Sequence, residues 1–152
     1  MGVYLALHML SVVIWVGGMF FAWMILRPVA ADQLDPPPRL KLWRGVFERF
    51  FPWVWVGIAL ILFSGSMMII ETGGLAATST SVRSMITLGS IMMLIFFHVY
   101  FAPFKHIRRC LDEGDFPGAG KQLATIRRLV GINTLIGLTT LAVATAGKYY
   151  LV

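Results

Sequence analysis

Three histidines are the side chains in this sequence best suited to bind a metal, and two of them lie within long apolar segments. His8 interrupts the apolar run LALHMLSVVIWVGGMFF, and His98 lies in LIFFHVY. An ionisable side chain is costly inside a membrane, so each of these two is a candidate for function. The alternative for each is a neutral histidine that is hydrogen-bonded to a neighbouring hydroxyl or carbonyl group. His106 lies among lysine and arginine residues, and we interpret it as a solvated residue at the membrane surface.

His8 and His98 are not expected to bind one metal within a single subunit. Their two apolar segments run in the same direction, and His8 precedes the midpoint of its segment whereas His98 follows the midpoint of its own. At about 1.5 Å per residue, this separates them by about 15 Å in depth. Four methionines share the depth of His8 instead: Met9, Met67, Met68 and Met85. Imidazole and thioether together suit Cu(I), and a His/Met pair suits haem iron.

The composition requires an apolar environment. Of the 152 residues, 58% are hydrophobic and 13% are charged, whereas soluble domains contain about 25% charged residues. A soluble fold of this size could not bury so much apolar surface, so we expect an integral membrane protein in a lipid bilayer. The net charge of +6 does not indicate nucleic-acid binding, because the basic residues lie in two loops between apolar segments. The single cysteine excludes an intrachain disulfide and a CxxC metal site.

The sequence predicts one transmembrane domain, residues 1–152, with an all-α fold. Four segments are long enough to cross a hydrocarbon core of about 30 Å as helices: residues 3–26, 51–70, 84–104 and 129–147. The first lacks a basic region before it and is too long for a cleaved signal peptide, so we expect a retained helix. Asp35 and the three prolines after it should stop any helix. The following stretch, RLKLWRGVFERFF, predicts a short interfacial helix over residues 39–50.

The distribution of lysine and arginine predicts the orientation in the membrane. The first and third loops hold almost all of these residues, whereas the middle loop has only Arg83 and the tails have only Lys148. Basic loops face the cytoplasm. We therefore expect both termini and the middle loop to face outward, which in a bacterial inner membrane is the periplasm.

Each predicted helix has a stripe of small or polar residues at spacings of three and four, which on membrane helices usually faces protein. We expect all four stripes to face the interior of a four-helix bundle, mainly for close packing. The stripes are His8, Ser11, Trp15, Gly18 and Ala22; Gly57, Ser64, Met68 and Glu71; Thr87, Ser90 or Ile91, Leu94 and His98; and Asn133, Gly137, Thr140 and Ala144.

Several of these stretches resemble the copper resistance protein D (CopD) family. His8 followed by Trp15-Val16-Gly17-Gly18 is similar to the signature of that family's first helix. RGVFERFF, Phe63-Ser64-Gly65 and RRLVGINTLIGL are similar to its second and fourth helices. The resemblance implies copper transport or copper homeostasis at the inner membrane, with His8 as the central ligand and the four methionines as soft ligands.

The LxLH start and the histidine of FFHVY also resemble HemJ-type protoporphyrinogen oxidase. That resemblance implies a haem b protein, either an electron carrier or an oxidase acting on a porphyrinogen. His8 would be an axial ligand, His98 matches the later histidine, and Trp15 and the glycines would make room for the macrocycle. That family also has an important lysine in its third helix. The matching position here is Thr87, so this sequence departs from the family's pattern there. A third hypothesis is a non-catalytic assembly factor with structural histidines. Whether the chain is an enzyme, and whether it forms a homodimer or joins a larger membrane complex, stays open.

Overall fold

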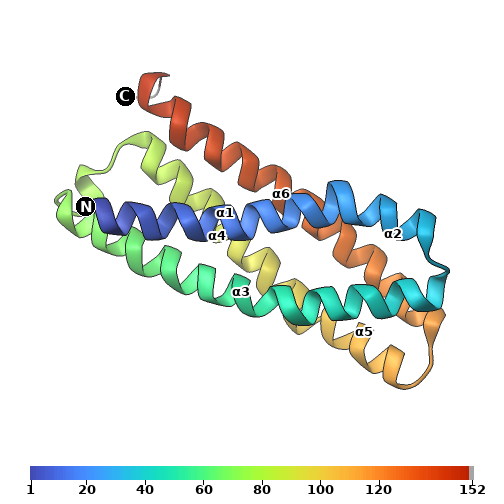
Figure 1. The fold of residues 1–152 in the computed structure, drawn as a ribbon. Coiled ribbons are helices and arrows are strands. Elements are labelled where there is room, and N and C mark those ends of the chain that lie inside the picture. Colours follow the sequence, from blue (N-terminus) through green and yellow to red (C-terminus); the bar gives the residue numbers. More distant parts are fainter. Residues whose placement is uncertain (151–152) are drawn as a thin grey trace.

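The computed structural model describes residues 1–150, with side chains as far as residue 147. Within these residues the chain is helical, and its helices pack along their lengths (Figure 1). Four helical segments are long and apolar enough to cross a membrane, which confirms the predicted all-α membrane fold. The elements are α1 (Gly2–Phe21), η1 (Ala22–Leu26), α2 (Arg27–Gln33), α3 (Pro36–Glu71), η2 (Leu75–Ala77), α4 (Thr80–Phe101), α5 (Pro103–Asp112) and α6 (Phe116–Tyr150).

The three prolines begin a helix instead of preventing one. Asp35 has an extended backbone and precedes the first turn of α3, in which Pro36 is the first residue. Proline is tolerated there, because the first N–H groups of a helix have no intrahelical partner. The prediction of a separate interfacial helix over residues 39–50 is therefore wrong. Those residues form the first part of α3, which continues without interruption through Pro52.

The first membrane segment contains a π-helical turn, η1, between α1 and α2. Pro28 lies at the start of α2. It has no N–H to donate to the carbonyl of Met24, and its ring crowds that turn. Widening the helix by one residue relieves both problems. The helix thereby extends as far as Gln33, beyond the span predicted from hydropathy.

Helices α1 and α3, which belong to the first and second membrane segments, pack against each other as an antiparallel pair. The terminal amine of Met1 lies 2.8 Å from the carboxylate of Glu71, at the last residue of α3. Further along the pair, Gly57 faces Ser11, whose carbonyl oxygen would lie 3.7 Å from an added Cβ. We call this interface the α1–α3 seam. The second half of the molecule is built similarly, since α6 packs against both α4 and α5.

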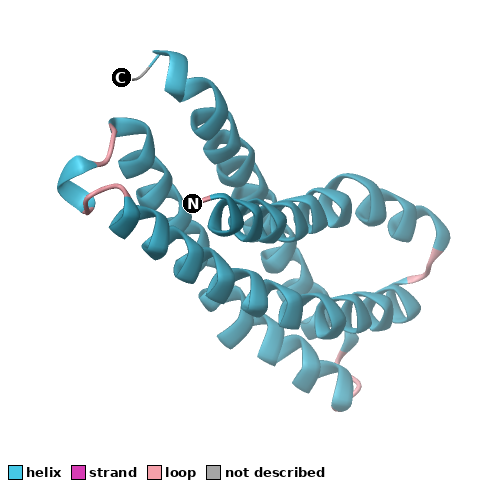
Figure 2. Ribbon diagram, turned by 60° about the vertical axis from the view of Figure 1, so that its left-hand side comes forward, coloured by secondary structure: helices cyan, strands magenta, loops and turns pink. Residues whose placement is uncertain are grey.

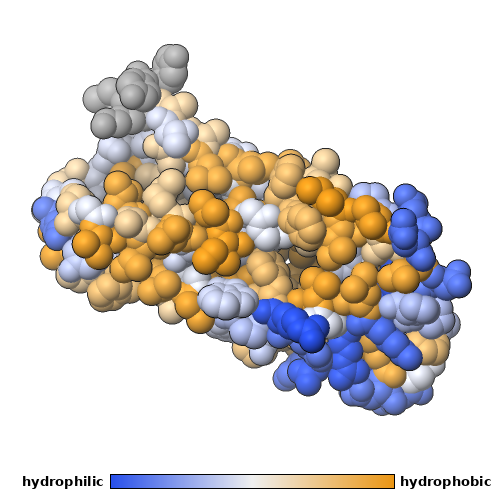
Figure 3. Space-filling model, in the orientation of Figure 1, coloured by the Kyte–Doolittle hydropathy of each residue, from blue (hydrophilic) through white to orange (hydrophobic). Residues whose placement is uncertain are grey.

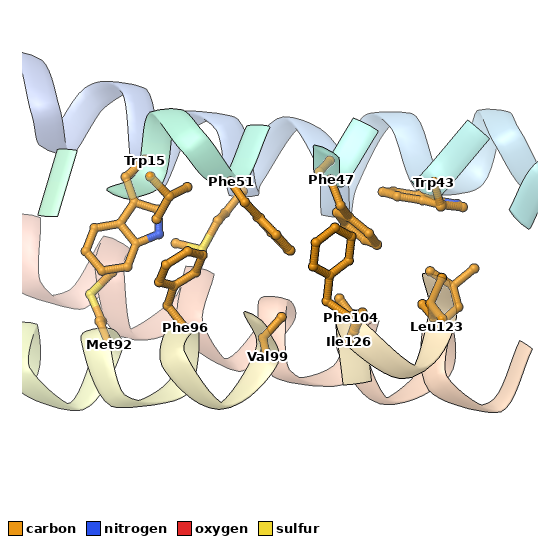
Figure 4. Close-up of a cluster of buried hydrophobic side chains, with 14 of the residues drawn as sticks. Trp15, Trp43, Phe47, Phe51, Met92, Phe96, Val99, Phe104, Leu123 and Ile126 are labelled. Carbon is orange, nitrogen blue, oxygen red and sulfur yellow. The ribbon is translucent and has the colours of Figure 1, made fainter. Parts of the chain in front are cut away.

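An aromatic core joins α3 to α4 and α5 (Figure 4). The ring of Phe51 is at its centre, with centroids 5.1 Å from Phe47, 5.4 Å from Phe96 and 4.8 Å from Phe104. Three pairs among these four rings are edge-to-face: Phe51 with Phe96, Phe51 with Phe104, and Phe47 with Phe104. Aromatic quadrupoles favour this arrangement. The core therefore fixes the relative positions of the helices near the middle of the molecule.

The surface has an apolar belt and one strongly hydrophilic end (Figure 3). Figure 1, in the same orientation, shows the loops that follow α2 and α5 at this end, and Figure 2 draws the loops in pink. Two ion pairs connect α3 to α5 there: the guanidinium of Arg44 lies 2.6 Å from Asp112, and that of Arg108 lies 3.6 Å from Glu48. Within α3, Arg44 also lies 2.9 Å from Glu48. We call this end of the molecule the basic end. The opposite end holds Met1, Glu71 and η2.

Candidate functional site

His8 lies in the α1–α3 seam, towards the end opposite to the basic end. Its Nδ1 atom is 3.1 Å from Oγ of Ser64. The imidazole ring rests on Gly65, where an added Cβ would lie 3.6 Å from Cε1. The side chain of His8 is half-buried, and Ser64 is completely buried. The sequence identified Ser64 only as a small residue of the packing stripe, so its contact with His8 is a finding of the structure.

The hydrogen bonds of Ser64 assign the tautomer of His8. Oγ of Ser64 also lies 2.5 Å from the carbonyl oxygen of Leu60. A carbonyl only accepts, and a hydroxyl has one hydrogen. Ser64 therefore donates to Leu60 and accepts from Nδ1–H of His8. A neutral imidazole that carries its hydrogen on Nδ1 has a lone pair on Nε2. No side chain of the described residues forms a hydrogen bond with Nε2, and the backbone carbonyl of Ile61 is a further acceptor close to the imidazole.

The four methionines predicted as soft ligands lie on three different helices and do not all border this seam. Met68 lies one turn beyond Ser64 on the same face of α3 and is half-buried, as is its neighbour Met67. Met9 points outward and is 39% exposed. Met85 is on α4, which packs chiefly against α6. Met67 and Met68 are therefore the thioethers that lie on α3 within about one turn of Ser64.

Carboxylate and thiolate ligands do not gather in the part of the chain that the structure describes. It contains no group of three or more His, Cys, Asp or Glu side chains that could hold a metal ion. A metal bound at His8 would therefore depend on thioethers or on backbone groups for its remaining ligands. Of these, only the thioether is a soft donor, and together with imidazole it suits Cu(I).

Three of the four predicted stripes face the interior, and the stripe on α4 does not. Ser11, Ser64 and Asn133 are buried within their stripes, whereas Glu71 is exposed at the end of α3. On α4, the buried face consists of Ser81, Met92, Phe96 and Val99. The exposed face consists of the predicted residues Thr87, Ser90, Ile91, Leu94 and His98.

The prediction for α4 is wrong for a physical reason. The hydroxyl of Thr87 donates to the carbonyl of Arg83 at 3.1 Å, and that of Ser90 donates to Ile86 at 2.8 Å. Such a bond within the helix is compatible with either face, since Ser11 donates to Leu7 in the same way and is buried. The aromatic rings of the core occupy the inner face of α4 instead.

His98 is exposed on the outer side of α4 and lies far from His8. Its neighbours Phe97 and Phe101 both contact Trp55, with ring centroids 5.2 Å and 6.2 Å apart. Trp55 precedes Ser64 by nine residues in α3, which corresponds to about 14 Å along the helix. The two histidines therefore lie at different depths, in agreement with the separation predicted from the sequence.

Trp15 is 3% exposed and lines an apolar cavity of about 230 Å³ among α1, α3, α4 and α6. His8 is not among the residues that line this cavity. Gly18 also lines it, but a Cβ there would overlap the ring of Phe50, so this glycine makes room for a side chain of α3. The residues that line this cavity therefore include Trp15 and Gly18 of the predicted haem arrangement but not His8.

The cavity does contain one polar group without a partner. The Nδ2 group of Asn133 donates to the carbonyl of Met92 at 3.3 Å, whereas its Oδ1 is buried with no hydrogen bond. The amide therefore ties α6 to α4 and presents an acceptor to an otherwise apolar space.

Residues 44–146 match a family model described as CopD, copper resistance protein D. The match includes α4, α5 and most of α3 and α6, so Ser64 and Met68 lie within it. It begins after α1, so His8 and Trp15 lie outside it. Comparisons with curated proteins and with solved structures gave no match.

Proposed function

Since the chain belongs to the CopD family, a family of copper resistance membrane proteins, we propose that it binds copper as cargo through Nε2 of His8. The proposal concerns the α1–α3 seam at the end of the molecule opposite to the basic end. In this proposal, the protein takes part in copper transport or copper homeostasis, and His8 is the central ligand.

The hydrogen bond between His8 and Ser64 is the observation that carries this proposal. Metal-binding histidines commonly donate their second ring N–H to a fixed acceptor, which orients the ring and increases the basicity of the ligand nitrogen. Ser64 has this position, because its own hydrogen is directed to Leu60. It is also completely buried, so water does not compete for the bond.

Thioether ligands from α3 would complete the site. Met68 follows Ser64 by one helical turn on the same face, and Met67 is adjacent to it. Methionine is flexible and its sulfur is soft, so it can reach a Cu(I) ion without a rigid scaffold. A site with one imidazole and flexible thioethers suits an ion that has to be released as well as bound.

The proposed location is the bacterial inner membrane, with the basic end in the cytoplasm. Lysine and arginine next to membrane spans favour the cytoplasmic side. The basic end carries Arg44 and Arg108, whereas His8 lies towards the other end. In this orientation the copper ligand is near the periplasmic surface.

A Cu(I) titration tests the proposal directly. The purified protein competes with a chromophoric Cu(I) chelator in detergent, as wild type and as His8→Ala, Met68→Leu and His98→Ala. We expect the wild type to bind copper, and we expect His8→Ala to lower the affinity at least tenfold, since it removes the central ligand. Met68→Leu should have a smaller effect. His98→Ala is the matched control, because it removes an exposed histidine from another helix.

Two results would contradict the proposal. One is a wild-type protein that takes up no Cu(I), and the other is a His8→Ala variant that binds copper as the wild type does. An absorption spectrum of the same samples, oxidised and then reduced, adds a separate check. A Soret band with sharp reduced α and β bands, lost in His8→Ala, would replace copper by haem b as the ligand of His8.

A further inference from the structure

A second pocket lies between α6 and the segment formed by η1 and α2, in the half of the molecule nearer the basic end. Its volume is about 370 Å³. We call it the arginine pocket, and its lining residues are Trp23, Arg27, Ala124, Arg127, Arg128, Gly131, Ile132 and Leu135. It is separate from the α1–α3 seam and from the apolar cavity, because it shares no lining residue with the cavity and contains neither His8 nor Ser64.

The positive charge of this pocket has no counter-charge within the described part of the chain. The ion pairs there do not include Arg27, Arg127 or Arg128. Nε of Arg127 is buried and has no hydrogen-bond partner. The charges of Arg27 and Arg39 are close enough to act unfavourably on that of Arg127. Buried donors are normally satisfied, so this arrangement calls for an anionic acceptor.

The wall of the pocket is formed by Trp23, which η1 presents to α6. The indole packs directly on Gly131, where an added Cβ would lie 2.8 Å from Nε1 of Trp23. A side chain at residue 131 would therefore push the ring out of place. Tryptophan is enriched at the level of the lipid headgroups. Trp23 and the arginines thus have the composition of a site at the membrane surface.

The pocket also has an apolar side. Ile132 is four residues after Arg128, and Leu135 is three residues after Ile132, so the three residues share one face of α6. Ile132 is 41% exposed and Leu135 is 55% exposed. They lie on the part of α6 that was expected to cross the membrane, where their neighbours are acyl chains. A ligand here would meet cationic donors at one end and apolar side chains at the other.

We propose that the arginine pocket binds the phosphate group of an anionic phospholipid, with its acyl chains along Ile132 and Leu135. Arginine forks donate paired hydrogen bonds to phosphate oxygens. Basic pockets between membrane helices are known to hold anionic headgroups. The phosphate satisfies Nε of Arg127 and offsets the repulsion among the arginines. This site is independent of copper binding at His8.

Thermal unfolding of the delipidated full chain in a neutral detergent tests the lipid site. Three additions are compared: phosphatidylglycerol, phosphatidylcholine with the same acyl chains, and inorganic phosphate. We expect phosphatidylglycerol at saturation to raise the Tm by roughly 5 °C. The other two additions should leave the Tm unchanged, because one lacks the net negative charge and the other lacks the acyl chains.

Arginine variants decide whether the pocket is responsible. Arg127→Gln and Arg128→Gln should lose the phosphatidylglycerol shift. Arg128 is exposed, so its variant remains informative if Arg127→Gln does not fold. Arg49→Gln is the control, because it removes one exposed charge from α3 outside the pocket. An equal shift with phosphatidylcholine or with inorganic phosphate would overturn the proposal. A shift that persists in Arg128→Gln, or that is lost equally in Arg49→Gln, would also overturn it.

Discussion

Ser64 accepts a hydrogen bond from His8 across the α1–α3 seam, with Oγ and Nδ1 3.1 Å apart, and it donates its own hydrogen to Leu60. The two hydrogen bonds form a chain in which His8 donates to Ser64 and Ser64 donates to the backbone of α3. They hold the ring in one tautomer with Nε2 available as an acceptor. The seam therefore holds the imidazole of His8 in one orientation through neutral hydrogen-bonding groups.

Replacement of Ser64 by alanine should weaken copper binding while leaving His8 in place. The ring loses its fixed acceptor, and partners of this kind typically contribute 10- to 100-fold to metal affinity. We expect the Cu(I) affinity to fall by about tenfold in the chelator competition. Ser66→Ala is the matched control, because Ser66 is an exposed serine two residues further along α3.

The ring nitrogens provide a second measurement for the same variant. The ¹⁵N chemical shifts of His8 should report hydrogen on Nδ1 in the wild type and a mixture of tautomers in Ser64→Ala. Unchanged shifts together with unchanged Cu(I) affinity would mean that Ser64 is a packing residue only.

The two glycines of the WVGG stretch should respond in opposite ways to substitution. Gly18 lies against Phe50, and a Cβ there would overlap the phenyl ring, whereas Gly17 has no atom within 4 Å of an added Cβ. We expect Gly18→Ala to lower the free energy of unfolding by about 1–3 kcal/mol, because Phe50 must move. Gly17→Ala should change it by less than about 1 kcal/mol, in the stabilising direction, since alanine is the better helix former.

Thermal unfolding of both variants in the same detergent makes this comparison. Equal loss of stability would show that the pair is required for a reason other than the packing of Phe50. Equal tolerance would show that Phe50 can move away at no cost.

Much of the fold could be predicted from the sequence because membrane spans depend on length and hydropathy. The inward positions of Ser11 and Asn133 followed from helical spacing alone, and both residues are buried. The same reasoning was wrong for α4, because Phe96 and its neighbours in the aromatic core occupy the inner face, and Thr87 and Ser90 are exposed. Spacing identifies a face, but it does not identify which face bulky aromatic residues will occupy.

The site was less predictable because it depends on how two helices slide past each other. His8 was identified from its type and its apolar surroundings. Its contact with Ser64 requires the register of the antiparallel pair α1 and α3, which residue types and spacing within one helix do not specify. The arginine pocket depends on η1, a local widening of the helix that hydropathy does not indicate.

Truncation of Phe51 should cause the largest loss of stability among the aromatic residues of α3. Its ring is 3% exposed and has centroid distances of 4.8 Å to Phe104 and 5.4 Å to Phe96. Phe51→Ala should lower the free energy of unfolding by about 3–5 kcal/mol, because it leaves a cavity and removes edge-to-face contacts. The control is Phe63→Ala on the same helix, whose side chain is 53% exposed and should cost far less. Chemical unfolding in mixed micelles measures both, and similar losses would contradict the central role of Phe51.

The orientation in the membrane can be tested with two exposed alanines at opposite ends of the molecule. Ala76 lies in η2, at the end of the molecule that is nearer His8. Ala31 lies in α2, at the basic end. In a Cys110→Ser background, each is replaced by cysteine and exposed to a membrane-impermeant maleimide. The basic end should be cytoplasmic. We therefore expect Ala76→Cys to react in intact cells whose outer membrane is permeable, and Ala31→Cys to react only after lysis. The reverse pattern would place His8 near the cytoplasmic surface, and copper would then reach the seam from inside the cell.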